Sequence, residues 1–299
     1  MATYEVEAPA PIVIKDPSEA LPAKIGRLVT RLPVHIFLLF IGVLWLMPTL
    51  GLFLESLLSP ADAQSNGWWK VIAHPHLATW ANYSNVWHGT DIPTSLRITA
   101  EIALGGTILP ILIAALAGYA FAWIDFPGRD WLFVGVIAML VVPLQMALIP
   151  IFTLYNKAHL YDTILGLILF HTAFGLPFAI FLLRNFFIGI PKDILESARI
   201  DGASEIRIFL KLILPLGLPA IASLAIFQFL WTWNDLLVAL TFGQNTTPIT
   251  VWIAGQLREF GTSIDIIAPA SFISLVVPLT VFFAFQRYFV QGLLAGSVK

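Results

Sequence analysis

The chain has 299 residues, of which 58% are hydrophobic and only 11% are charged. A soluble domain carries about a quarter charged residues, so this composition excludes an ordinary soluble protein and indicates a chain that lies in a lipid bilayer. The net charge of −2 gives no basic footprint for nucleic acid, and the absence of cysteine excludes disulfides and thiol chemistry.

Residues 1–31 are predicted to form a cytoplasmic N-terminal tail. The first part of this segment, MATYEVEAPAPIVIKDPSEA, is acidic and rich in proline. It lacks the basic start and the apolar run of a secretory signal. We expect it to be disordered or loosely ordered.

Six stretches without Asp, Glu, Lys or Arg are long enough to cross a bilayer, which takes roughly 20 residues of helix. They cover residues 32–54, 102–124, 131–156, 163–183, 212–234 and 266–286. Buried helices of a soluble protein are a poor alternative, because too little polar surface would remain to cover them. We predict an all-α, polytopic membrane protein with six transmembrane helices over residues 32–290 and a cytoplasmic tail at 291–299.

Each predicted span contains a proline, namely Pro48, Pro110, Pro143 with Pro150, Pro177, Pro219 and Pro278. Proline removes a backbone donor and kinks a helix, and in a bilayer the freed carbonyl groups need partners from neighbouring helices or water. A membrane anchor does not need such kinks. Six kinked spans together favour a bundle that bends around a transport pathway.

The basic residues predict the orientation of the chain. With a cytoplasmic N-terminus, the inner segments hold 12 Lys and Arg residues and the outer segments hold 4. Basic residues concentrate on the cytoplasmic side of membrane proteins, so both termini are placed in the cytoplasm. The outer loop at residues 59–93 contains His74, His76 and His88, but no cysteine or carboxylate cluster accompanies them, so we predict no metal site.

The inner segment 191–211 is predicted to form two short helices. Pro191 suits the first turn of a helix, and Gly202 can leave helical geometry and end it. Ser204 is a candidate N-cap for the second helix, which enters the membrane at Phe209. The first helix has an apolar face and a charged face, formed by Ile194, Leu195 and Ala198 against Glu196 and Arg199. An ordinary interfacial loop is the plainer alternative.

Neutral polar and aromatic side chains lie inside or at the ends of the predicted spans. They are Gln145, His171, Thr172, Gln228, Trp231 and Asn234. Asp235 follows at the outer end of the fifth span, where an ionisable residue is a functional candidate. An equally good alternative is that Asn234 and Asp235 only break or cap the helix. Further along, residues 243–248 (GQNTTP) predict a turn in the long outer loop 243–265.

The segment ESARIDGASEIRIFLKLILP resembles the EAA loop of ABC importer permeases. Glu196, Ala198, Gly202, Leu214 and Pro215 fall on the spacing of that loop, whereas Ser197 replaces an alanine and Leu212 an isoleucine. The stretches ATWANYSNVW, Trp-Asn-Asp-Leu at 233–236 and the C-terminal segment from residue 269, with Gln-Arg-Tyr-Phe at 286–289, resemble carbohydrate permeases. The resemblance runs from about residue 84 to 299 and identifies the chain as similar to a maltose-type permease subunit of a sugar ABC importer.

This resemblance implies the partners and the site residues. An ATPase subunit would dock on Glu196, Ser197, Ala198, Asp201, Gly202, Leu214 and Pro215. The pathway candidates for a neutral sugar are Gln145, His171, Gln228, Trp231, Asn234 and Asp235. An extracytoplasmic sugar-binding protein would contact the outer turn at Asn245, Thr246 and Thr247. A second, homologous permease subunit and two ATPase subunits would complete the complex in the inner membrane of a bacterium or archaeon.

No Gly-Lys-Ser or Gly-Lys-Thr phosphate loop is present, so this chain is not the ATPase. We therefore expect no cofactor and no catalytic residue here, and we expect the partner ATPase subunits to bind ATP and Mg²⁺. An ion-coupled secondary sugar carrier is the main alternative. Glu101, Arg184 and Asp235 lie only at the edges of the predicted spans, which argues against a mid-membrane ion site.

Overall fold

A computed structural model of the chain describes residues 21–65, 67–260 and 263–295. It divides into two compact units, residues 1–54 and 55–299. The first unit contains most of α1 (Leu21–Ser56), a continuous helix that includes Pro33 and Pro48. This helix begins before the predicted span start at residue 32. Of the predicted tails, 1–31 and 291–299, residues 1–20 and 296–299 lie outside the described residues, whereas 21–31 and 291–295 are helical parts of α1 and α14.

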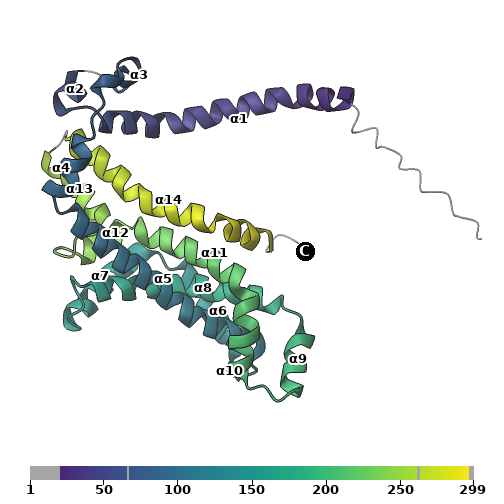
Figure 1. The fold of residues 1–299 in the computed structure, drawn as a ribbon. Helices are drawn as coiled ribbons and strands as arrows, with labels where there is room; N and C mark the ends of the chain where they lie inside the picture. The colour runs from purple at the N-terminus through teal and green to yellow at the C-terminus, as the bar shows by residue number, and fades with distance from the viewer. Residues whose placement is uncertain (1–20, 66, 261–262, 296–299) are drawn as a thin grey trace, which may run out of the picture. The chain divides into compact units, whose positions relative to one another are not determined.

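The second unit is built on three long helices, α5 (Ile92–Trp123), α8 (Ile164–Ile188) and α11 (Leu214–Trp233). The helix α14 (Ile264–Ala295) packs along α11, and α5 has its most extensive contact with α8 (Figure 1). A Cβ atom on Gly118 of α5 would lie only 3.1 Å from the backbone nitrogen of Arg184. The two helices therefore approach closely because glycine stands at that position.

The third predicted span is not one straight helix. The helix α6 (Arg129–Ala138) continues through a 3₁₀ turn, η3 (Met139–Val141), and α7 (Leu144–Lys157) leaves at 100° to it. The break follows from Pro143, because a residue that precedes proline is pushed out of helical geometry. Val142 is accordingly extended, with φ −70° and ψ 115°.

The prolines at 110, 150, 177, 219 and 278 lie inside helices that remain continuous. The described residues contain five helices that are long and apolar enough to cross a membrane, and six if the bent pair α6–α7 is one span. They contain no strand. The prediction of an all-helical membrane protein is confirmed at this level.

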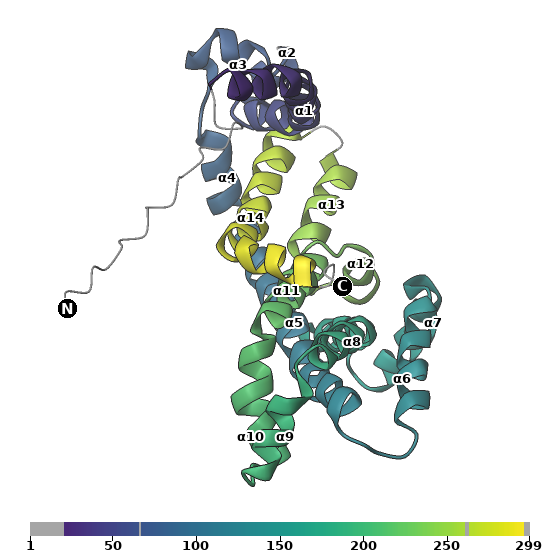
Figure 2. The ribbon, with the colours of Figure 1, turned by 90° about the vertical axis from the view of Figure 1, so that its right-hand side faces the viewer.

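One end of the second unit, which the sequence predicts to face the cytoplasm and which we call the inner end, carries two short helices, α9 (Lys192–Ile200) and α10 (Glu205–Ile208), and a π-helical turn, η4 (Phe209–Ile213). The opposite end carries α4 (Ala81–Gly89), α12 (Leu237–Phe242) and α13 (Ile249–Phe260), as Figure 2 shows. Three smaller elements, α2 (Pro60–Ser65), α3 (Lys70–Ala73) and η2 (Pro75–Leu77), precede α4.

The long outer segment 243–265 is therefore mostly helical. Only residues 243–248 form the turn that the sequence predicts, and α13 follows directly. Ile249 is buried, and it packs in a cluster that includes Val86, Ile92 and Ala270. The outer segment is thus held against α4, α5 and α14 by apolar contacts.

Candidate functional site

The helix α9 is held to the bundle by one buried side chain. Leu195 is fully buried in the inner core, which includes Leu183 of α8 and Ile213 of η4. It is the only buried residue of α9, and Glu196, Ser197 and Ile200 are exposed. The remaining side chains of the helix thus form a surface that the rest of the described chain leaves largely uncovered.

Gly202 ends α9 as the sequence predicts. Its φ of +78° lies in the left-handed region, which glycine adopts without steric cost. The N–H of Ala203 donates to the carbonyl of Ala198, and the N–H of Gly202 donates to that of Arg199, each at 3.0 Å. These two bonds are the Schellman pattern of helix termination. Ser204 stands at the N-cap of α10, but its side chain makes no capping bond.

Polar contacts join α9 and α10 to the end of α5. Arg199 Nε lies 2.9 Å from Glu205 Oε1, and Tyr119 of α5 donates its hydroxyl to Glu205 Oε2. Arg199 Nη2 also donates to the backbone carbonyl of Trp123 at 3.2 Å. The sequence motif contained Glu205 and Arg199, but nothing in it indicated that Tyr119, 86 positions away from Glu205, would complete the group.

The predicted docking residues divide into two groups. Glu196, Ser197, Ala198, Asp201 and Gly202 lie together on α9 and its terminal turn. Leu214 and Pro215 lie farther along the chain, beyond α10 and η4, where they begin α11. On α9, Glu196 Oε1 lies 2.6 Å from Lys192 Nζ, and that contact lowers the pKa of the Glu196 carboxyl.

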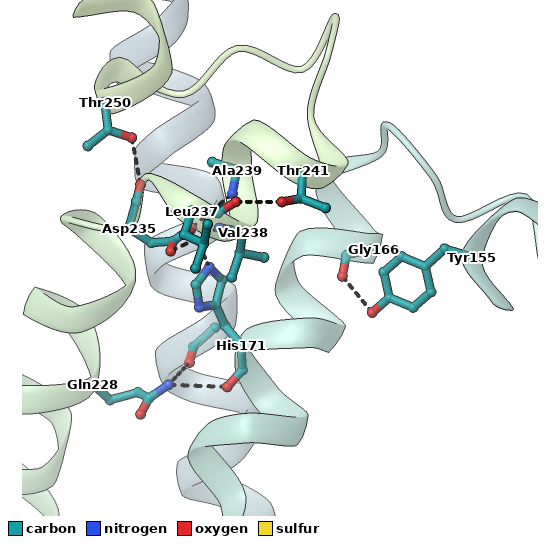
Figure 3. A network of polar contacts seen from close by, with 11 residues as sticks. Tyr155, Gly166, His171, Gln228, Asp235, Leu237, Val238, Ala239, Thr241 and Thr250 are labelled. Carbon is teal, nitrogen blue, oxygen red and sulfur yellow. Dashed lines mark hydrogen bonds and ion pairs between the residues drawn. The ribbon is translucent and has the colours of Figure 1, made fainter. Parts of the chain in front are cut away.

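Three of the predicted pathway residues form a buried polar network (Figure 3). Gln228 of α11 donates through Nε2 to the carbonyl of Gly106 in α5 at 3.0 Å and to that of His171 in α8 at 3.4 Å. A Cβ atom on Gly175 would lie 2.6 Å from Gln228 Nε2, so only glycine leaves room there for the amide. Gln228 therefore ties three long helices together.

Asp235 follows the end of α11 and caps the next helix. Its carboxylate accepts bonds from the backbone N–H groups of Val238 at 3.2 Å and Ala239 at 3.0 Å, in the first turn of α12. One carboxylate oxygen also lies 3.6 Å from His171 Nε2. Burial raises the pKa of Asp235, although the N–H bonds from α12 oppose that shift. The capping alternative describes what this carboxylate does here, and a pathway role for it stays a prediction.

A small cavity adjoins this network. Its volume is about 10 Å³, and its lining includes His171, Thr232, Trp233 and Asp235. Such a space is near the lower limit for one water molecule and is far too small for a sugar. His171 Nδ1, Thr232 Oγ1 and Trp233 Nε1 are buried polar atoms without a partner among the described residues. The network is thus a packed part of the fold, not a binding cavity.

The other predicted pathway residues are exposed. They are Gln145 near the start of α7, Trp231 in the last turn of α11, and Asn234 just after α11. Trp231 is 41% exposed, and the edge of its ring contacts His171 with 5.5 Å between ring centroids. The six predicted residues therefore do not meet in one cavity of this chain. Those of the buried network, His171, Gln228 and Asp235, contribute to its internal packing. The other three, Gln145, Trp231 and Asn234, lie at its surface.

The predicted outer contact turn is fastened by a residue that the sequence did not single out. Asp162, which precedes α8 with φ +57°, accepts bonds from the backbone N–H groups of Asn245 and Thr246, each at 2.9 Å. Burial acts to raise the pKa of Asp162, but these hydrogen bonds outweigh it and lower the pKa. Thr247 is half-buried next to them, whereas Asn245 remains exposed.

No cluster of His, Asp and Glu side chains that could hold a metal occurs among the described residues. Three histidines of the outer loop were considered as ligands from the sequence. His74 and His76 contact each other edge to face, with ring centroids 5.7 Å apart. His88 lies in α4.

Comparison with known proteins gives several matches. Residues 110–294 match the family described as binding-protein-dependent transport system inner membrane component. The chain is 48% identical to the osmoprotective compounds uptake permease protein GgtD of Synechocystis over 90% of this chain and 92% of that protein. It is 51% identical to the alpha-glucoside transport system permease protein AglG of Rhizobium meliloti, over 75% of this chain and 61% of that protein.

A solved structure has the same fold. It is described as a bacterial ABC transporter involved in the import of the acidic polysaccharide alginate. The TM-score is 0.70 at 22% sequence identity, with 92% of this chain and 100% of the other covered.

Proposed function

Because the chain belongs to the inner membrane components of binding-protein-dependent transport systems, we propose that it is the permease subunit of an importer for sugars. It is a multi-pass inner membrane protein and a transport subunit, not an enzyme. The proposed substrates are oligosaccharides or glycosides. The relative named for alpha-glucosides supports this class.

The helix α9 is the observation that carries the coupling part of the proposal. It lies at the inner end of the bundle, packs against the core through the buried Leu195, and exposes Glu196, Ser197 and Ile200. Ile200 is 86% exposed, so its side chain is accessible to a partner. We assign this surface, together with Ala198, Asp201 and Gly202, to an ATPase subunit.

ATP is bound by separate ATPase subunits in systems of this family, and the Mg²⁺ that accompanies ATP belongs there as well. The proposed complex has two ATPase subunits, a second and homologous permease, and an extracytoplasmic sugar-binding protein. Closure of the ATPase pair would move the docked helices and open the pathway outward. Leu214 and Pro215 begin α11, so they would act by setting the path of that span from the docking segment.

This chain would supply half of the pathway. Of the predicted pathway residues, Gln145, Trp231 and Asn234 are exposed, and we assign these three to contact with a substrate or the second permease. An exposed indole suits the apolar face of a sugar ring, and neutral amides suit its hydroxyl groups. His171, Gln228 and Asp235 would support these residues through the buried network.

At the outer end, the proposed contact with the sugar-binding protein is the turn with Asn245, Thr246 and Thr247. The carboxylate of Asp162 fixes the backbone of this turn by accepting hydrogen bonds from the N–H groups of Asn245 and Thr246. The side chain of Asn245 remains at the surface. We also propose that both chain termini lie in the cytoplasm of a bacterium or archaeon, on the same side of the membrane as α9.

Reconstitution in liposomes tests the proposal. Purified alone, the chain should neither hydrolyse ATP nor accumulate sugar. Adding the ATPase, the second permease and the loaded binding protein together should produce both activities. Uphill sugar uptake by this chain alone, driven by a proton or sodium gradient, would instead establish the secondary carrier.

A further inference from the structure

Two chain turns flank α9, and this raises the question of how the helix could transmit a force. The turn at Gly189 and Pro191 separates α9 from α8, and the turn at Gly202 separates it from α10. Leu195 is its only buried side chain. A short helix with a turn at each end, and with only Leu195 and the small, partly buried Ala198 packed on the core, can pivot, so a push on it need not reach the bundle.

The polar group around Glu205 removes that freedom. Arg199 of α9 bonds Glu205 of α10 through Nε at 2.9 Å and through Nη2 at 3.3 Å. The same carboxylate accepts a hydrogen bond from the hydroxyl group of Tyr119, in the last part of α5. Arg199 returns to α5 by donating to the carbonyl of Trp123 at 3.2 Å. The contacts close a ring that contains α9, α10 and one turn of α5.

The inner end of α5 is in turn fixed to α8 and to η4. Trp123 Nε1 donates to the carbonyl of Phe187 at 2.9 Å, and the Tyr119 ring lies 5.4 Å from that of Phe209. Tyr119 is buried, so its hydroxyl has little access to water as an alternative partner. Charged hydrogen bonds such as those of Arg199 with Glu205 are stronger and more directional than neutral ones.

We propose that Tyr119, Arg199 and Glu205 are positioning residues for energy coupling: they form a brace that makes α9 and the inner end of α5 move as one body. The inference rests on the proposed function, in which an ATPase subunit docks on α9. Motion of the ATPase then reaches α5 directly through the brace, and not only along the chain into α8 and α11. Because α5 packs along both α8 and α11, the whole bundle receives the motion.

Replacing Tyr119 with phenylalanine tests the brace within the full complex. Tyr119→Phe keeps the ring against Phe209 and removes only the hydroxyl donor. We expect the ATPase subunits to co-purify normally and ATP hydrolysis to continue, while the amount of sugar moved per ATP falls several-fold. Glu205→Ala should give the same loss, and Glu205→Gln should recover part of the coupling because an amide oxygen still accepts from Tyr119.

Tyr155 offers a matched control. Its hydroxyl donates to the carbonyl of Gly166 at 2.9 Å, and its side chain is also buried, but it lies in α7, away from the docking segment. Tyr155→Phe should leave the ratio of sugar to ATP unchanged. An unchanged ratio in both Tyr119→Phe and Glu205→Ala, or an equal fall in Tyr155→Phe, would overturn the brace. Failure of the unmodified chain to retain the ATPase would instead refute the proposed docking itself.

Discussion

The two ends of the helical bundle use their polar residues in opposite ways. At the outer end, the carboxylates of Asp162 and Asp235 stabilise the fold itself, because each accepts backbone N–H bonds that fix a turn or begin a helix. At the inner end, the ring around Glu205 uses only part of the polar side chains. Glu196, Ser197 and the apolar Ile200 are left on an exposed surface.

This difference separates residues that build the permease from residues that are available to a partner. The buried polar network of Gln228, His171 and Asp235 stabilises the relative positions of α5, α8, α11 and α12. The helix α9 contacts the bundle through the buried Leu195, and most of its other side chains are exposed. The proposed docking of a partner requires such an exposed surface. The predictions below test whether the two ends differ in this way, beginning with the largest expected effect.

Loss of the Leu195 anchor should have the largest effect. Leu195→Ala leaves a cavity in the inner core, at a cost of about 2–5 kcal/mol for a fully buried leucine. We expect α9 to detach locally and ATPase retention to fall strongly, as measured by co-purification. Ile188→Ala is the matched control, since Ile188 is exposed in the last turn of α8, outside the docking helix. Equal losses in the two variants would show that Leu195 is not the anchor.

Gly202→Val should have a smaller but clear effect. The cost arises from the left-handed backbone, because no atom lies within 4 Å of a Cβ placed there. A left-handed residue with a side chain costs roughly 1–2 kcal/mol, and a β-branched one lies at the upper end. Sugar uptake and stimulated ATP hydrolysis should fall while membrane insertion stays normal.

Two variants control for this change. Gly202→Asn should retain most of the activity, since asparagine tolerates left-handed geometry. Gly135→Val introduces valine at a glycine of α6 that also has open space around it and no positive φ. Full transport by Gly202→Val would count heavily against the docking function of this turn.

Asp162→Asn should loosen the outer turn alone. A charged acceptor is lost from the N–H groups of Asn245 and Thr246, at a cost of about 1 kcal/mol for a partly exposed site. Hydrogen exchange at the Thr246 amide should become faster, and ATPase retention should not change. Unaltered exchange would mean that Asp162 does not hold the turn.

The pH dependence of the outer turn follows from the lowered pKa of Asp162. A carboxyl with a lowered pKa contributes stability that is complete above its unfolded value, about 3.9 for aspartate, and is lost as pH falls through the folded value. Exchange at Thr246 should therefore show no titration by Asp162 between about pH 5 and 8. A transition of this carboxyl within that range would contradict the assigned hydrogen bonds.

Single cysteines at the outer turn should produce the smallest perturbation. Asn245→Cys and Thr246→Cys should cross-link to the sugar-binding protein in the outward-facing state. Asn245 is the more favourable position, because it is exposed and Thr246 is half-buried. A functional transporter without a cross-link at either position would reject the contact.

The sequence predicted the fold class and the turn at Gly202 because both depend on local properties. Long apolar stretches specify spans, and Gly202 ends α9 by its own conformational freedom. The prolines show the limit of such reasoning. Pro143 breaks its span, but Pro110 and Pro177 do not. Burial does not separate these cases, because Pro48 and Pro150 are exposed and also lie inside continuous helices. The sequence therefore shows where a proline stands but not whether its helix breaks.

The site depended even more on long-range contacts. Gln228 and His171 appear in the sequence as polar groups within spans, and only packing shows that they bond backbone carbonyl groups of neighbouring helices. Asp162 and Tyr119 have no local signal at all, since their partners lie 84 and 86 positions away. The sequence predicts a long outer loop over residues 243–265, whereas residues 249–260 form α13, whose 12 residues are too few for a span.

Site-specific photo-cross-linking tests the docking of α9 most directly. A photoreactive residue at position 200 is compared with one at position 141, where the native Ile200 and Val141 are 86% and 81% exposed. Val141 lies in η3, in the bent span, away from α9. In the assembled, transporting complex, position 200 should yield an adduct with an ATPase subunit and position 141 should not. No ATPase adduct at position 200, or equal adducts at both positions, would contradict the assignment of α9 as the docking helix.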